Sequence, residues 1–108
     1  MHDQIFNQIT QDLKNNDIVL FMKGNTLMPR CNFSAVVCSI LNDLGVKYKE
    51  CDVLLDNNLR EGIKTYSDWP TIPQLYIKEE FIGGCDIVKE IHASGELLEL
   101  LKKHHLVA

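Results

Sequence analysis

Five consecutive apolar residues, Ile18-Val19-Leu20-Phe21-Met22, constrain the fold of this chain more than any other segment. A strand with one solvated face alternates apolar and polar residues, whereas this run offers no polar face to water. Such a strand is stable only where helices cover both faces of its sheet. The run therefore predicts an α/β architecture with a buried strand over residues 18–22.

The segments around this strand predict the elements that pack on it. Apolar residues recur with helical spacing over residues 3–14, and a second helical stripe begins after Cys31 and ends before Gly45. This stripe consists of Phe33, Val36, Val37, Ile40, Leu41 and Leu44. Residues 46–53 are then interpreted as a second strand. Because a helix joins the two strands, we expect them to be parallel.

The second half of the chain predicts three more helices and a hairpin. Asp56 and Asp86 are each placed to cap a helix start, and leucines over 97–101 predict the last helix. Residues 75–77 and 81–82 flank a charged turn, which is typical of a hairpin. The order α-β-α-β-α-β-β-α-α then gives one four-stranded mixed sheet flanked by about five helices.

Length and charge limit the classes of function. A chain of 108 residues is expected to form a single domain over residues 1–108. Its net charge of −4 argues against a nucleic-acid-binding protein, which usually has a basic surplus. No apolar run approaches the length of a membrane span, and Met1-His2-Asp3 does not begin a signal peptide. We therefore expect no nucleic acid and no membrane among its partners.

The four cysteines, at positions 31, 38, 51 and 85, form no CxxC pair and match no zinc-site spacing. A disulfide scaffold is not expected in a chain without an export signal. We therefore expect free thiols in a reducing compartment. Cys38 and Cys51 are interpreted as packing residues.

Cys31 stands out because it follows the buried strand and begins the second predicted helix. Unpaired backbone N–H groups and the helix dipole favour a thiolate at that position. Lys23 and Arg30 carry positive charge nearby in the sequence and are expected to act in the same direction. Three residues on, where a redox dithiol motif carries its second cysteine, the chain has Ser34.

Four short motifs occur in order along the chain. They are Lys23-Gly24, Pro29-x-Cys31-x-Phe33-Ser34, Trp69-Pro70-Thr71-Ile72-Pro73 and Gly83-Gly84-Cys85-Asp86. Together they resemble a monothiol glutaredoxin of the CGFS type, with Asn32 in place of the motif's glycine. The resemblance implies a thioredoxin fold, glutathione binding, and a 2Fe–2S cluster held between two subunits with a glutathione thiolate beside each protein cysteine.

The resemblance also implies roles for individual residues. Cys31 would be the catalytic thiol and the metal ligand. Lys23 and Arg60 would hold the glycine carboxylate of glutathione. The residues alone favour a site role for Lys23, which directly ends the buried strand on the side where the helix begins, whereas Arg60 could equally be a solvated surface charge. Pro73 matches the cis-proline of the fold, although the sequence itself leaves the isomer open. The backbone of Ile72 would pair with the cysteinyl part of glutathione in a strand-like manner.

Gly84, Cys85 and Asp86 would bind the γ-glutamyl end of glutathione. A turn followed by a helix start offers backbone N–H groups to an anion, and a glycine lets a ligand approach the backbone closely. The residues alone are also compatible with a hairpin exit and a helix cap. In some relatives a second thiol lies near the first, so Cys85 is a candidate disulfide partner of Cys31.

The function implied by the resemblance is iron–sulfur cluster storage and transfer. The alternative is a weak glutathione-dependent thiol-disulfide oxidoreductase, because Ser34 leaves no internal resolving thiol for protein disulfides. Expected partners are glutathione, a second copy of the chain when the cluster is bound, a BolA-type protein and cluster recipients. The form without a cluster is expected to be a monomer. The bacterial cytoplasm is the expected location, with the mitochondrial matrix as the alternative.

Overall fold

The computed structural model describes residues 2–107. In chain order its elements are α1 (His2–Asn15), β1 (Ile18–Met22), α2 (Asn32–Asp43), β2 (Lys49–Asp52), the 3-10 helix η1 (Val53–Leu55), α3 (Asn57–Ser67), β3 (Gln74–Ile77), β4 (Glu80–Gly83), α4 (Cys85–Ser94) and α5 (Glu96–Lys103). The strands form one sheet in the order β2-β1-β3-β4. β1 pairs parallel with β2 and antiparallel with β3, and β3 pairs antiparallel with β4. The predicted mixed sheet and its five α-helices are confirmed within the described residues, and the arrangement is a thioredoxin-like fold.

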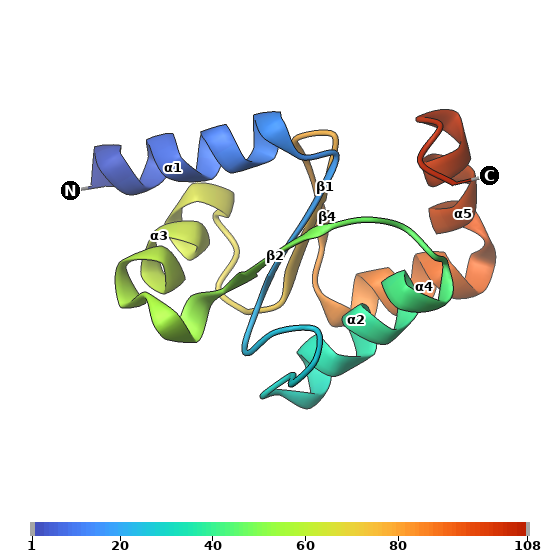
Figure 1. Cartoon of the computed structure of the whole chain (residues 1–108), viewed down its shortest axis with the longest axis horizontal. Helices are drawn as coiled ribbons and strands as arrows, with labels where there is room; N and C mark the ends of the chain where they lie inside the picture. The colour runs from blue at the N-terminus through green and yellow to red at the C-terminus, as the bar shows by residue number, and fades with distance from the viewer. Residues whose placement is uncertain (1, 108) are drawn as a thin grey trace.

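The strand β1 lies inside the sheet, and all five of its residues are buried. Its alternate side chains contribute to two separate cores. Ile18, Leu20 and Met22 pack with α2, α4 and α5, whereas Val19 and Phe21 pack with α1 and α3. Figure 1 shows these two groups of helices on opposite sides of the strands. The requirement for helices on both faces, inferred from five apolar residues, is therefore met.

The second strand is shorter than the predicted range of 46–53. Pairing with β1 begins at Lys49 and stops at Asp52. There the carboxylate of Asp52 accepts a hydrogen bond from the backbone N–H of Leu54 at 2.9 Å and starts η1. The same carboxylate oxygen accepts a hydrogen bond from the N–H of Gly24 at 2.9 Å. An acidic side chain that bonds local backbone groups thus ends the strand.

One of the two predicted helix caps is correct. Asp56 accepts hydrogen bonds from the N–H groups of Asn58 and Leu59 and caps α3 as expected. Asp86 does not cap α4, because that helix begins two residues earlier than predicted and has Gly84 at its N-cap. Asp86 instead lies in the first turn, where its negative charge still favours the positive end of the helix dipole.

No helix within residues 2–107 is both long enough and apolar enough to cross a membrane.

Candidate functional site

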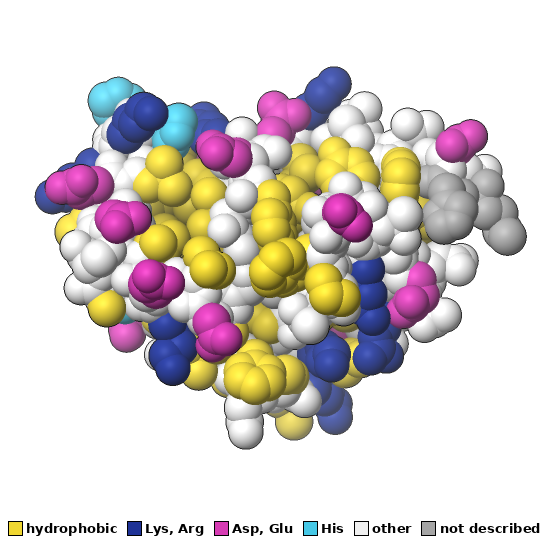
Figure 2. All heavy atoms as spheres, turned by 180° about the vertical axis from the view of Figure 1, so that it is seen from behind, with side chains coloured by type: hydrophobic (Ala, Val, Ile, Leu, Met, Phe, Trp, Pro, Cys, Tyr) yellow, Lys and Arg dark blue, Asp and Glu magenta, His cyan; other side chains and the backbone are white. Residues whose placement is uncertain are grey.

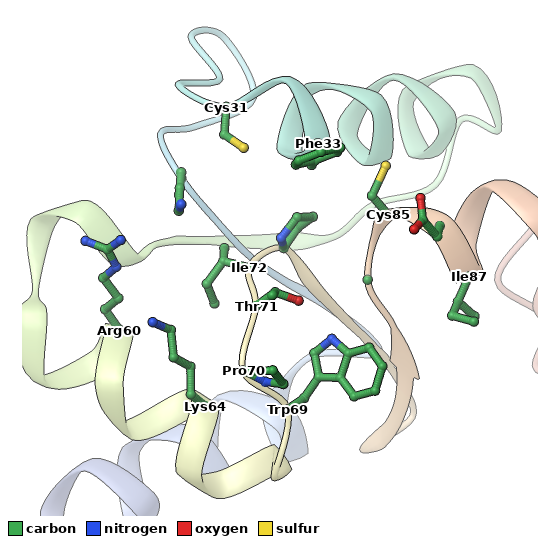
Figure 3. A pocket seen from close by; sticks show the side chains of 14 residues that line it. Cys31, Phe33, Arg60, Lys64, Trp69, Pro70, Thr71, Ile72, Cys85 and Ile87 are labelled. Atoms are coloured by element: carbon green, nitrogen blue, oxygen red, sulfur yellow. The ribbon is translucent and has the colours of Figure 1, made fainter.

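A cavity of about 440 Å³ opens where the starts of α2 and α4 and one side of α3 meet the segment before β3 (Figure 3). Its lining comprises Lys23, Cys31, Phe33, Arg60, Lys64, Trp69, Pro70, Thr71, Ile72, Pro73, Gly84, Cys85, Asp86 and Ile87. The eight residues singled out from the sequence are all among them. They come from four segments that are far apart in the chain. The fold therefore brings the predicted site residues to one cavity.

Cys31 is the N-cap residue of α2, with extended backbone angles (φ −149°, ψ 136°), and its side chain is partly exposed. Burial acts to raise the pKa of its thiol. This effect is outweighed by hydrogen bonds from the backbone N–H groups of Ser34 and Phe33, the charge of Lys23 and the hydroxyl of Ser34. The pKa of Cys31 is therefore lowered from its ordinary value, as predicted. Arg30, which the sequence also suggested, is not among the causes.

Ser34, in the first turn of α2, helps to hold this arrangement in place. Its side chain is fully buried, and its hydroxyl accepts a hydrogen bond from the backbone N–H of Lys23 at 3.1 Å. The end of β1 is thereby joined to the first turn of α2. The sequence marked Ser34 only as the place of a missing cysteine, so this bridging role was not foreseen.

Positive charge gathers on one side of the cavity. Arg60 and Lys64 reach toward it from α3, one helical turn apart (Figure 3). Lys23, which directly follows β1, adds a third cation to the lining. The Nε atom of Arg60 is buried and has no hydrogen-bond partner within residues 2–107. A buried donor without a partner carries a free-energy cost that an anionic ligand would relieve. Lys64 was not identified from the sequence, where it is one of many surface lysines.

The opposite side of the cavity is formed by the start of α4. Cys85, Asp86 and Ile87 lie in its first turn, and Gly84 precedes it. A Cβ atom added at Gly84 would lie 3.1 Å from the carbonyl oxygen of Pro73. The glycine thus permits close approach of two backbone segments of the protein itself, in addition to the close approach of a ligand that the sequence suggested.

The segment before β3 forms the wall between these two sides. Its Ile72–Pro73 peptide bond is cis, as the resemblance implied. Ile72 is buried, whereas Trp69 is partly exposed at the rim. The backbone of this segment is held by Gln74, whose amide group donates to the carbonyl oxygens of Trp69 and Thr71.

Cys31 and Cys85 project into the same cavity, and both are free thiols (Figure 3). Burial raises the pKa of Cys85, the opposite of the shift at Cys31. Cys38 and Cys51 are buried away from the cavity and are also free, as predicted. The Sγ of Cys38 lies 3.5 Å from the Sδ of Met22 in the core.

Exposed apolar side chains line part of the cavity, and one of them contradicts a prediction. Phe33 was placed on the buried stripe of its helix, but it is 60% exposed and lines the cavity. The helix starts before the core does, so the first position of the periodic stripe projects beyond the sheet. Ile87 is likewise exposed and lines the cavity. On the face shown in Figure 2, hydrophobic side chains lie beside Lys and Arg side chains.

Asn32 occupies the position where the CGFS motif has glycine. It is the first residue of α2, its side chain is exposed, and it is not among the residues that line the cavity. The described non-glycine residues with positive φ are Asp68, Lys78, Glu79 and His105, and Asn32 is not one of them. The backbone at this position therefore does not require glycine.

Comparisons with known proteins agree with this architecture. The family model described as Glutaredoxin matches residues 18–82. A probable monothiol glutaredoxin 2 of Rickettsia conorii is 50% identical over 96% of this chain and 97% of its own length. The solution structure of a monomeric truncated mutant of Trypanosoma brucei 1-C-Grx1 has a TM-score of 0.88 and 39% identity, over 95% of this chain and 94% of that one.

A crystal structure described as a buckwheat glutaredoxin–glutathione complex has a TM-score of 0.87 at 23% identity, covering 99% of this chain and 96% of that one. At this identity the likeness concerns the fold alone. The family model covers more than half of the chain, and the rickettsial relative extends over nearly all of it. From this fold, this cavity and these similarities we conclude that the chain belongs to the glutaredoxin family, and within it to the monothiol type.

Proposed function

We propose that the cavity binds glutathione. Its charge distribution suits a peptide with a carboxylate at one end and an amino acid group at the other. Lys23 and Arg60 would take the glycine carboxylate, which would also satisfy the buried Nε of Arg60. The backbone of Ile72 would pair with the cysteinyl part.

The other end of the cavity would take the γ-glutamyl group. The N–H groups at the start of α4 would receive its carboxylate, and the carboxylate of Asp86 would receive its ammonium group. Gly84 and Cys85 complete this end of the proposed site. A cavity of about 440 Å³ lies within the range of small-ligand sites.

We further propose that two copies of the chain carry a 2Fe–2S cluster for storage and transfer. A 2Fe–2S cluster is held by four thiolates. Within residues 2–107 no group of three or more His, Cys, Asp or Glu side chains is arranged to hold a metal ion, so one chain alone offers too few ligands. Cys31 of each copy and the thiol of each bound glutathione would supply the four.

The observation that carries this proposal is the partly exposed, low-pKa thiol of Cys31, open to a cavity with the charge pattern for glutathione. Two of the four ligands would belong to an exchangeable molecule, which suits release of the cluster to a recipient protein. A BolA-type helper and the bacterial cytoplasm belong to the same proposal, and the bacterial relative supports that location. The chain without cluster is expected to be a monomer.

The test is anaerobic cluster reconstitution with glutathione, followed by visible absorbance and size-exclusion chromatography. We expect a coloured dimer that reverts to a colourless monomer when glutathione is removed. Cys31→Ser should abolish the colour, whereas Cys51→Ala, which removes a buried thiol outside the cavity, should retain it. A coloured Cys31→Ser dimer would refute the proposed ligation.

A second function, glutathione-dependent reduction of mixed disulfides, is favoured by the lowered pKa of Cys31. The Cys31 thiolate would attack the glutathione sulfur of a mixed disulfide and release the substrate as a thiolate, which takes up a proton. A second glutathione thiolate would attack the Cys31–glutathione disulfide, regenerating Cys31 and releasing oxidised glutathione. Turnover of a glutathionylated small substrate measures this activity, and its absence in the wild-type chain would exclude it.

A further inference from the structure

Gln74 is a polar residue in a place where the core is otherwise apolar. It is the first residue of β3, its backbone pairs with Phe21, and its side chain has no exposed surface. Its Nε2 atom donates to the carbonyl oxygen of Trp69 at 3.1 Å and to that of Thr71 at 3.2 Å. Both hydrogens of the amide group are therefore used on one short segment.

That segment, residues 69–73, forms a wall of the cavity. It contains two prolines, which supply no backbone N–H, and it belongs to neither a helix nor a strand. The two hydrogen bonds from Gln74 join alternate carbonyl groups of the segment to the start of β3. The positions of Trp69, Thr71 and Ile72 along the wall thus depend on one buried side chain.

The side chain of Gln74 also lowers the free energy of unfolding in one respect. Its Oε1 atom is buried and has no hydrogen-bond partner within the part of the chain that the structure describes. A buried acceptor without a partner is destabilising, and an unbranched apolar side chain such as methionine would fill similar space without that penalty. The two hydrogen bonds to the segment act against this cost, so the net contribution of the amide to stability is small.

We propose that Gln74 is a positioning residue of the ligand site: it holds the carbonyl groups of Trp69 and Thr71 so that the backbone of Ile72 is presented to glutathione. The inference rests on the proposed glutathione site and adds to it a determinant that does not line the cavity. Removing the amide takes away two hydrogen bonds to the segment and also one buried unpaired oxygen, so it should lower ligand affinity more than it changes the free energy of unfolding.

The decisive variant is Gln74→Met, with Gln74→Leu as a second apolar replacement. Glutathione binding is followed by calorimetry, and thermal unfolding is recorded on the same samples. We expect an affinity about 5- to 30-fold weaker, the factor that corresponds to one or two net hydrogen bonds, with an unfolding midpoint close to that of the wild type, because the loss of two hydrogen bonds and the loss of one unpaired oxygen offset each other. Thr10→Val, which removes a hydrogen bond to Tyr66 between two residues that do not line the cavity, is the control and should leave the affinity unchanged.

A measurement without ligand distinguishes this inference from the proposed function. Trp69 is the only tryptophan of the chain and lies in the segment that Gln74 holds, so acrylamide quenching of its fluorescence reports the segment directly. We expect stronger quenching in Gln74→Met. If the wild type fails to bind glutathione, the quenching change still tests the positioning role. Unchanged quenching in both variants, affinity within twofold of the wild type, or a loss of affinity that follows a loss of folded protein would each overturn the inference.

Discussion

The buried hydroxyl of Ser34 accepts a hydrogen bond from the backbone N–H of Lys23 at 3.1 Å. The contact joins the end of a buried strand to the helix that has Cys31 as its N-cap. It places the cation of Lys23 and the N–H groups of the first helical turn around the same sulfur, and each of these groups lowers the pKa of Cys31. Ser34, which stands in place of the second cysteine of a dithiol motif, thus joins β1 to α2 and lowers the pKa of Cys31.

Ser34→Ala should therefore raise the pKa of Cys31, since it removes the hydroxyl and leaves the N–H of Lys23 without its partner. The rate of iodoacetamide alkylation against pH measures the thiol pKa directly. A buried donor left unpaired should also cost about 1–3 kcal/mol in the free energy of unfolding. If the alkylation profile is the same as in the wild type, the hydroxyl does not act on the thiol.

The two thiols of the cavity should react in different ranges of pH. Burial raises the pKa of Cys85, whereas the helix start and Lys23 lower that of Cys31 in spite of burial. Because the thiolate is the reactive form, a limited alkylation at neutral pH should label Cys31 first, and Cys85 should react only as the pH rises further. Peptide mapping by mass spectrometry after timed alkylation checks the order, and equal labelling of both cysteines at neutral pH would contradict it.

The sign of the linked effect on stability follows from the same shift. A depressed thiol pKa in the folded chain favours the thiolate, so the contribution of Cys31 is present above its unfolded pKa and is lost as the pH falls through its folded pKa. For Cys85 the protonated thiol is favoured, so its contribution is lost as the pH rises.

The fold could be predicted from the sequence to a large extent because its strongest signals are local. Five apolar residues fix a strand that is covered on both faces, and Gly45 and Asp56 mark helix ends by their own chemistry. The error at Phe33 has a different origin. Helical periodicity identifies the side of a helix that faces the core, but it does not say where along the helix the core begins.

The candidate site could be assembled from the sequence only through motifs. Arg60 and Cys85 lie on separate helices, and no spacing along the chain states that they face one cavity. Lys64 and Gln74 were missed because one resembles an ordinary surface lysine and the other an ordinary strand residue. Their roles depend on which backbone segments pass nearby, and this is decided by the tertiary structure.

Gly84→Ala should weaken glutathione binding. A Cβ at this position would lie 3.1 Å from the carbonyl oxygen of Pro73, so the start of α4 and the wall of the cavity would have to move apart. Overpacking of this kind costs about 1–3 kcal/mol. Affinity measured by calorimetry, together with thermal unfolding, provides the check.

Gly45→Ala serves as the matched control for this substitution. Gly45 has a positive φ of 71° and open space around its missing Cβ, so alanine there strains the backbone without touching the cavity. It should lower stability by about 1 kcal/mol and leave the affinity unchanged. Equal effects of the two variants on affinity would show that the closeness of Gly84 to Pro73 does not matter for the ligand.

The loop that leads to Cys31 is hydrogen-bonded to the edge strand β2 through Thr26. Its hydroxyl donates to the carboxylate of Glu50, and the Tyr48 hydroxyl, which has one proton to share, lies 2.9 Å from the Thr26 hydroxyl and 3.0 Å from the Asn42 Oδ1. Thr26 lies in the loop between β1 and α2. Because Tyr48→Phe removes a contact of this residue, the loop should become more mobile, while the amides of β1 should stay protected from hydrogen exchange. Hydrogen exchange of the amides of residues 25–30 measures the loosening.

The pH dependence of stability separates the hydroxyl of Tyr48 from the packing of its ring. Burial is the main cause that raises the pKa of Tyr48 to about 12 from 10. The folded chain then holds the phenolic proton more tightly than the unfolded chain. The contribution of Tyr48 to stability is therefore complete below pH 10 and is lost as the pH rises toward 12.

The free energy of unfolding, measured with urea across this range, should fall less steeply with pH in Tyr48→Phe than in the wild type. Tyr76, whose pKa burial also raises to about 12, is present in both proteins, so the difference between the two curves belongs to Tyr48. Parallel curves would mean that the Tyr48 hydroxyl titrates in the folded chain as it does in the unfolded one.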